Sequence, residues 1–119
     1  MKTTKYYKAI IDFGGGCIVE RNLRLQADTY IRGGGLAIVA FERNGEPWSD
    51  ITVNLPGYFP EYGTAFIDTN NNPWAEAFLV EHDIAEPTAY FGHSGFCSYP
   101  LYKFDMKKFK TKYPNDMSR

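Results

Sequence analysis

Glycine turns divide the first half of this chain into short segments. Two triple-glycine runs occupy residues 14–16 and 33–35, and Asn44-Gly45 is the residue pair most typical of tight β-hairpin turns. Apolar and polar side chains alternate from Leu23 to Ile31, as in a strand with one buried face and one face in water. This half of the chain is therefore predicted to form short strands joined by turns.

Further segments have strand character. Residues 6–13 alternate with a period near two, and residues 36–41 are apolar on both faces, which predicts a central strand. In residues 48–55 the side chains of Ile51, Val53 and Leu55 are expected to face the core. Residues 96–104 are predicted to form another strand after a turn at Gly92 and Gly95.

Two helices are predicted. Asn72 is suited to cap the first, and Pro73 to occupy its first position, where the missing N–H costs nothing. Asp105 is predicted to cap a short basic helix over residues 106–113 that stops before a proline. The apolar face of the first helix follows the 3.6-residue period and contains Trp74, Ala75, Phe78, Leu79 and His82.

Together these segments predict an α+β fold. We expect one twisted antiparallel sheet of about five or six strands, with the helix near Trp74 packed on one face and the C-terminal helix at an edge. With 119 residues, 44% of them apolar, the chain can build one modest core. A single domain over residues 1–119 is therefore expected, ordered from about residue 5 to residue 113. No apolar run approaches the roughly 20 residues that cross a bilayer, and the first residues do not resemble a signal peptide, so we expect a cytoplasmic protein.

Two dense motifs stand out, Asp68-Thr69-Asn70-Asn71-Asn72-Pro73-Trp74 and Ser94-Gly95-Phe96-Cys97-Ser98-Tyr99-Pro100-Leu101-Tyr102. With residues 35–41 and 51–55, they resemble a family of small uncharacterised bacterial proteins, a domain of unknown function carried on mobile genetic elements of gut bacteria. The resemblance covers roughly residues 24–105. It implies a single small domain in a mobile-element context and brings no established active site.

Charge is segregated along the chain, although the net charge is only -1. Residues 42–86 hold nine acidic side chains and one basic side chain, and both flanking segments are basic. The acidic side chains either pair with basic ones across the fold or form a face that attracts a basic partner. For the second case we predict a partner-binding surface that combines acidic residues at the hairpin turn with a rigid aromatic loop: Glu42, Glu46, Asp50, Tyr58, Phe59, Glu61 and Tyr62.

Other residues support weaker interpretations. Cys97 with His93 is the one pair from which nucleophilic catalysis could be built, but the more favourable interpretation places Cys97 as a structural residue in a strand. A metal site would recruit Asp68, His82 and Asp83, with Asp12 as an optional further ligand. Their spacing is not diagnostic, so no metal and no cofactor are expected. Four lysines could contact a phosphate backbone, although they are also typical of a solvated helix: Lys107, Lys108, Lys110 and Lys112.

Three classes of function follow from these observations. The leading expectation is a non-enzymatic protein-binding module, sharpened by the resemblance into an inhibitor of a basic host defence nuclease, of the anti-CRISPR or anti-restriction kind. The alternatives are a nucleic-acid-binding accessory protein, which uses the C-terminal lysines, and a Cys97-dependent hydrolase. A protein partner is thus expected and nucleic acid is not, and the sequence does not specify the oligomeric state.

Overall fold

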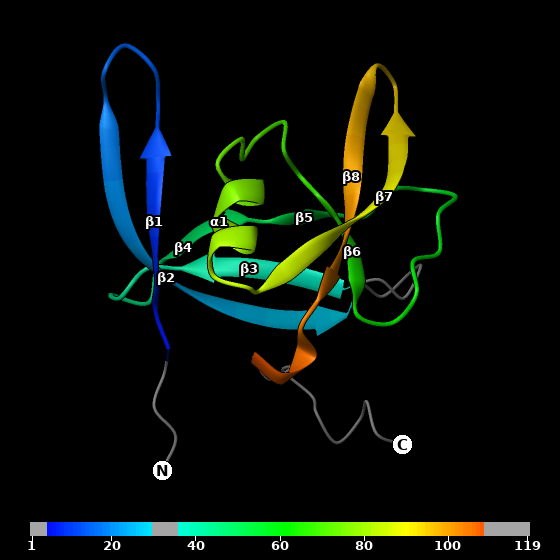
Figure 1. Ribbon diagram of the computed structural model, residues 1–119, viewed down its shortest axis with the longest axis horizontal. Coiled ribbons are helices and arrows are strands. Elements are labelled where there is room, and N and C mark those ends of the chain that lie inside the picture. The colour runs from blue at the N-terminus through cyan, green and yellow to red at the C-terminus, as the bar shows by residue number, and fades with distance from the viewer. Residues whose placement is uncertain (1–4, 30–35, 109–119) are drawn as a thin grey trace.

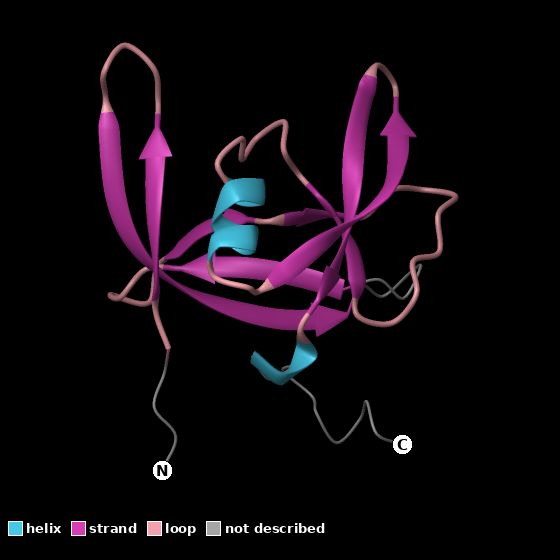
Figure 2. Ribbon diagram, in the orientation of Figure 1, coloured by secondary structure: helices cyan, strands magenta, loops and turns pink. Residues whose placement is uncertain are grey.

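The structure is a computed structural model that describes residues 5–29 and 36–108. Two four-stranded antiparallel sheets enclose one short α-helix (Figures 1 and 2). The strand order is β1-β2-β3-β4 in the first sheet and β5-β6-β8-β7 in the second. The elements are β1 (Tyr7–Asp12), β2 (Ile18–Thr29), β3 (Leu36–Phe41), β4 (Pro47–Asp50), β5 (Thr52–Val53), β6 (Thr64–Ile67), α1 (Ala75–Glu81), β7 (Ala85–Ser94), β8 (Cys97–Phe104) and a 3-10 turn (Met106–Lys108).

Strand β2 belongs to two pairings in succession. Its first half pairs with β1 as far as Leu23, and its second half pairs with β3 from Arg24 onward. The first half therefore leaves the sheet with β1 as a two-stranded ribbon, which projects from the body of the molecule (Figure 1). The glycine run closes this ribbon, because all three glycines adopt positive φ angles and the Phe13 N–H donates to the Cys17 carbonyl at 2.8 Å.

Ile51 is the corner between the two sheets. Its N–H donates to the Ile38 carbonyl on β3 at 2.9 Å, and its own carbonyl accepts from the Asp68 N–H at 2.8 Å. The chain before Ile51 pairs with β3 as β4, and the chain after it pairs with β6 as β5. One extended segment thus contributes a strand to each sheet and holds the sheets together.

Helix α1 packs into the core between the sheets (Figure 2). It buries Ala75, Phe78 and Leu79, as the helical period predicted. The helix ends in a Schellman motif, because Asp83 adopts φ 55 and the Ile84 N–H donates to the Leu79 carbonyl at 2.9 Å. Ile84 and Leu79 are both fully buried, which is the apolar contact that accompanies this motif.

The α+β prediction is wrong, because the molecule is mostly β and has two sheets of four strands in place of one sheet of five or six. The predicted strand over residues 48–55 is split at Ile51. The sequence patterns predict neither strand β6 nor strand β7. All four residues of β6 are buried, and β7 is exposed at most positions and contains Pro87, so neither shows the alternation of a half-buried strand.

The helix predictions also need correction. The N-cap of α1 is Trp74, without a side-chain hydrogen bond, because the Asn72 side chain is used elsewhere. Asn72 is buried, donates to the Asp50 carbonyl at 2.7 Å and accepts from the Ser49 hydroxyl, which ties this turn to β4. In place of the predicted C-terminal helix, the described residues form only the 3-10 turn Met106–Lys108. Residues 109–113 of that prediction lie outside the described residues.

Candidate protein-binding surface

The structure separates the two halves of the predicted partner surface. Glu42 and Glu46 flank the turn between β3 and β4, whereas residues 56–63 follow β5 at the other end of the same extended segment (Figure 1). The seven residues from Pro47 to Val53, six of them in β4 and β5, span at most about 20 Å at the usual rise per residue. The acidic turn and the aromatic loop therefore face different surroundings, and Asp50 lies between them on β4.

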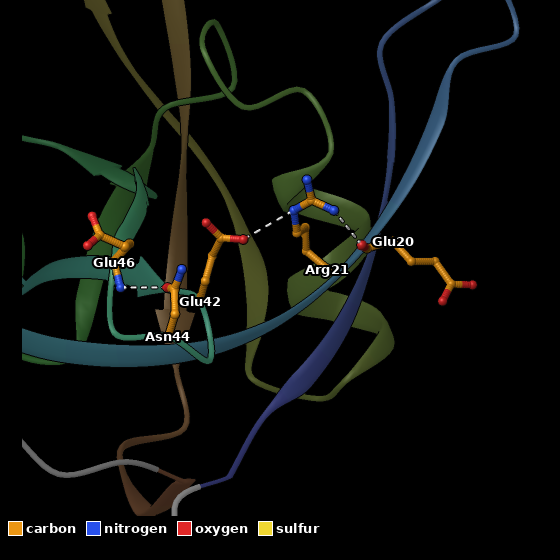
Figure 3. A network of polar contacts seen from close by, with 5 residues as sticks. All are labelled: Glu20, Arg21, Glu42, Asn44 and Glu46. Atoms are coloured by element: carbon orange, nitrogen blue, oxygen red, sulfur yellow. Dashed lines mark hydrogen bonds and ion pairs between the residues drawn. The ribbon is translucent and has the colours of Figure 1, made fainter.

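The acidic turn carries less free charge than its sequence suggests. The half-buried Glu42 forms an ion pair with Arg21 at 3.2 Å, and Figure 3 shows this arginine also reaching the Glu20 carbonyl. Arg43 is exposed in the same turn, with its guanidinium over the Tyr6 ring. The Glu46 N–H donates to the Asn44 side chain at 2.9 Å, while its carboxylate stays exposed. Two arginines thus offset much of the charge of the acidic residues here.

Within the aromatic loop, Tyr58 and Phe59 have different roles. Tyr58 is half-buried against Phe66, with ring centroids 5.2 Å apart, and its hydroxyl accepts from the His93 N–H on β7 at 3.0 Å. Phe59 is 80% exposed. Tyr58 therefore holds the loop against β7, which presents Phe59 to solvent beside that strand.

The last two residues of the predicted surface lie toward a separate cleft. Tyr62 is exposed and lines a cleft of about 560 Å³ between the end of α1 and the end of β8. The exposed Glu61 precedes it, and its carbonyl accepts from the Thr64 N–H at 3.0 Å. The charged residues that line the cleft are of both signs: Asp83, Glu86, Lys103, Asp105 and Lys107. The cleft is therefore not a purely acidic surface.

Strand β7 contains a bulge that the sequence did not reveal. Pro87 pairs with Tyr102 and Phe91 pairs with Pro100, so three residues of β7 oppose the single residue Leu101 of β8. The Thr88 hydroxyl donates to the Leu101 carbonyl at 2.9 Å and accepts from the Tyr90 N–H at 3.2 Å, which replaces the interrupted ladder. Ala89 adopts φ 77, a strained value for a residue with a Cβ. The bulge leaves Tyr90 and Phe91 exposed.

The hairpin of β7 and β8 ends in a fully exposed aromatic ring. Gly95, at φ 61, makes the tight turn, and Phe96 follows it at the tip with no burial. Below the tip the hairpin packs closely against the side chain of Leu55, because a Cβ at Gly92 would lie only 2.6 Å from it. We call this unit the aromatic hairpin, defined by its exposed rings Tyr90, Phe91 and Phe96.

The geometry separates the groups of the hydrolase interpretation. His93 pairs with Ser98 and Ser94 pairs with Cys97, so the imidazole and the thiol lie on opposite faces of the hairpin. Cys97 instead lies on the face of Tyr99, where a hydrogen bond with the thiol is the main cause that raises the pKa of the Tyr99 phenol. His93 is therefore not placed to act as the base that activates Cys97.

The residues of the metal interpretation have other partners. The His82 ring packs on Tyr7 and Phe78, and its Nε2–H donates to the Lys8 carbonyl at 2.7 Å. The Asp68 carboxylate accepts from Asn71. In the described ranges 5–29 and 36–108, no group of three or more candidate metal ligands occurs. Of the four lysines, Lys107 is exposed, whereas Lys110 and Lys112 lie outside those ranges.

No helix in the part of the chain that the structure describes is long and apolar enough to cross a membrane. Neither a curated protein nor a solved structure matches the chain. A family model, a domain of unknown function designated DUF4313, matches residues 24–119. The match begins at the residue where β2 changes its partner from β1 to β3, so it includes the whole aromatic hairpin but not the β1–β2 ribbon. The chain therefore belongs to the DUF4313 family.

Proposed function

We propose that this protein is a non-enzymatic protein-binding module that contacts its partner through the aromatic hairpin. The observation that supports the proposal is the exposure of Tyr90, Phe91 and Phe96 on one hairpin, to which Tyr58 fixes the loop that carries the exposed Phe59. Several exposed aromatic rings on one unit are costly to leave in water, and such rings are typical anchors of protein interfaces. The strained bulge supports the same interpretation, because backbone strain tends to be retained where it positions functional side chains.

A finer version of the proposal concerns the biological setting. We propose a cytoplasmic bacterial protein encoded on a mobile genetic element, which inhibits a host defence nuclease of the CRISPR or restriction kind. Support comes from the resemblance of its motifs to such proteins and from the acidic middle of the chain, which favours a basic partner. The aromatic rings supply most of the affinity in this proposal, since arginines offset the acidic turn.

The proposal is tested first by finding the partner and then by measuring its affinity. Crosslinking and mass spectrometry on bacterial lysate would identify the partner, which is then purified. Replacing Phe96 and Tyr90 by serine should weaken binding by at least tenfold, mainly through faster dissociation, because hot-spot rings contribute about 2 kcal/mol each. Val80→Ser is the matched control, since it removes an exposed apolar side chain from α1. Equal affinity of all variants would contradict the proposed surface.

The finer version has its own test. Expression in bacteria with an active restriction or CRISPR system should raise the efficiency with which a targeted plasmid is established, and the Phe96→Ser, Tyr90→Ser variant should not. An unchanged efficiency in all such hosts would contradict the inhibitor function. The aromatic hairpin as a binding surface would still be tested separately by the affinity measurement.

A further inference from the structure

The main-chain hydrogen bonds of β1 define a free edge near the tip of its ribbon. The Phe13 N–H donates to Cys17 across the turn, so the pairs 13/17, 11/19 and 9/21 are the hydrogen-bonded ones. The N–H and C=O groups of residues 8, 10 and 12 consequently point away from β2. Two side-chain contacts agree with this pattern: His82 bonds the Lys8 carbonyl from outside, and Arg21 bonds the Glu20 carbonyl on the other edge.

Two residues of this edge keep unpaired main-chain groups. His82 occupies the edge at Lys8, but Ile10 and Asp12 have no hydrogen-bond partner for their N–H and C=O among residues 5–29 and 36–108. Ile10 is also 59% exposed. In Figure 1, β1 is the strand of the ribbon that lies on the side of α1, so its edge faces the space between the two hairpins.

We propose that this edge binds an extended segment of a partner protein as an added antiparallel strand. An exposed edge with free N–H and C=O groups is a template for strand addition unless proline, a bulge or a covering side chain blocks it. Neither Ile10 nor Asp12 is a proline or part of a bulge, and no side chain of residues 5–29 and 36–108 bonds their outward main-chain groups. The inference deepens the proposed protein-binding function and adds a second contact to the one made by the aromatic hairpin.

Charge along the edge specifies the chemistry of the segment. Lys8, Ile10 and Asp12 are all exposed on the same face of the ribbon. Opposite charges and apolar pairs are favourable directly across an antiparallel ladder. The preferred segment therefore has, from its N-terminus, a basic residue opposite Asp12 and an apolar residue opposite Ile10, where the main-chain groups are free. An acidic residue follows beyond the end of the ladder and attracts the Lys8 side chain, since His82 already bonds the Lys8 carbonyl. Small polar residues occupy the positions between them.

The probe for this inference is the peptide Thr-Lys-Thr-Val-Thr-Glu-Thr with blocked ends, titrated into the ¹⁵N-labelled protein. We expect saturable shifts of the Ile10 and Asp12 amide signals. N-methylation of the peptide valine should weaken binding at least about tenfold, because it removes the donor to Ile10 and crowds the ladder. Exchanging the lysine and glutamate of the peptide should weaken it severalfold. Absence of saturable shifts, or equal binding of the N-methylated peptide, would overturn the inference.

Protein variants provide the matched comparison. Ile10→Pro removes the outward N–H without removing a bond to β2 and should abolish peptide binding, whereas Ile10→Thr keeps the N–H and should bind. If Ile10→Pro does not fold, the N-methylated peptide still decides the question. A dimer of the free protein that Ile10→Pro converts to monomer would mean that a second copy fills the edge, which would also overturn the inference. Phe96→Ser should bind the peptide normally, so failure here is distinguishable from failure of the aromatic hairpin.

Discussion

The β1–β2 and β7–β8 hairpins project from the same side of the molecule, and both expose apolar side chains near their tips (Figure 1). Their edges differ. Along β7, Pro87 lacks an N–H, the bulge interrupts the ladder and Tyr58 binds the His93 N–H. Along β1, within the part of the chain that the structure describes, a side chain covers only the base of the edge, where His82 bonds the Lys8 carbonyl. One hairpin can thus bind a partner through side chains alone, and the other also offers its main chain.

The hairpins are also anchored to α1 in different ways. On β1 the Tyr7 ring packs edge-on against Phe78, with centroids 6.3 Å apart. On β8 the Tyr102 hydroxyl donates to the Glu76 carboxylate at 2.6 Å. His82, the C-cap of α1, also donates to the Lys8 carbonyl on β1, but a hydrogen bond to a charged acceptor is stronger than one to a neutral carbonyl. We therefore expect the aromatic hairpin to be the more rigid of the two.

The largest effect on this comparison should come from Gly92→Ala. The added Cβ would lie 2.6 Å from Leu55 and 2.7 Å from Phe66, so the aromatic hairpin must shift away from the loop. We expect a loss of about 3 kcal/mol in the free energy of unfolding, measured by urea denaturation. Ser94→Ala, an exposed position in the same strand, should cost little. A loss below about 0.5 kcal/mol at Gly92 would show that the hairpin is not seated as described.

Tyr102→Phe should cost about 2 kcal/mol, because it leaves the half-buried Glu76 without its donor. Tyr7→Phe should cost less, since the Tyr7 hydroxyl has no hydrogen-bond partner among the residues that the structure describes. If the two variants lose similar amounts of unfolding free energy in the same urea experiment, the two hairpins are not anchored differently by these tyrosines.

The same tyrosines predict a dependence on alkaline pH. Burial raises the pKa of Tyr102 above the ordinary 10.0, with a further contribution from Glu76, and burial also raises the pKa of Tyr7. Above pH 10 the unfolded chain therefore loses protons that the folded chain keeps. The contribution of these tyrosines to the free energy of unfolding is complete below pH 10 and declines as the pH rises. The decline should be shallower in Tyr102→Phe. If the free energy of unfolding falls with pH at the same slope in wild type and variant, Tyr102 is not the cause of the decline.

Thr88→Val tests the bulge and should cost about 1.5 kcal/mol, because it removes the hydroxyl that bridges Leu101 and Tyr90. Thr88→Ser keeps the hydroxyl and should restore most of the stability. If the valine variant is as stable as the serine variant, the hydroxyl does not support the bulge, and the position of Tyr90 needs another explanation.

Tyr58→Phe should have the smallest effect on stability, about 1 kcal/mol or less. It leaves the His93 N–H free on the β7 edge, so the two edges become more alike. Analytical ultracentrifugation should then detect association that increases with protein concentration. Unchanged association would mean that Pro87 and the bulge protect the edge without Tyr58.

Some of this fold could be predicted from sequence because the signals are local. Alternation predicted β1, and the apolar run of residues 36–41 predicted β3 as a central strand, which its position between two neighbours confirms. The Asn44-Gly45 hairpin is also confirmed, with Gly45 at φ 90. Local patterns could not show the corner at Ile51 or the use of Asn72 as a link to β4, since both depend on residues distant in the chain.

The candidate surface was harder to predict. The sequence did suggest exposed aromatic side chains, and Phe59 and Tyr62 are exposed. The sequence groups them with the acidic turn, because the two segments are close along the chain, whereas the structure separates them. Tyr90, Phe91 and Phe96 were missed, although Gly95 before Phe96 marks a tight turn that could have placed this ring at a tip. The bulge at Ala89 has no sequence signal that we can identify.

Residue-resolved amide hydrogen exchange tests the difference between the two edges most directly. We expect Tyr58 to protect the His93 N–H, and the Ile10 and Asp12 N–H groups to exchange at nearly unprotected rates. Tyr58→Phe should remove the protection at His93 alone. Protection at Ile10 and Asp12 in the free protein, or exchange at His93 as fast as at Ile10, would contradict a closed β7 edge beside an open β1 edge.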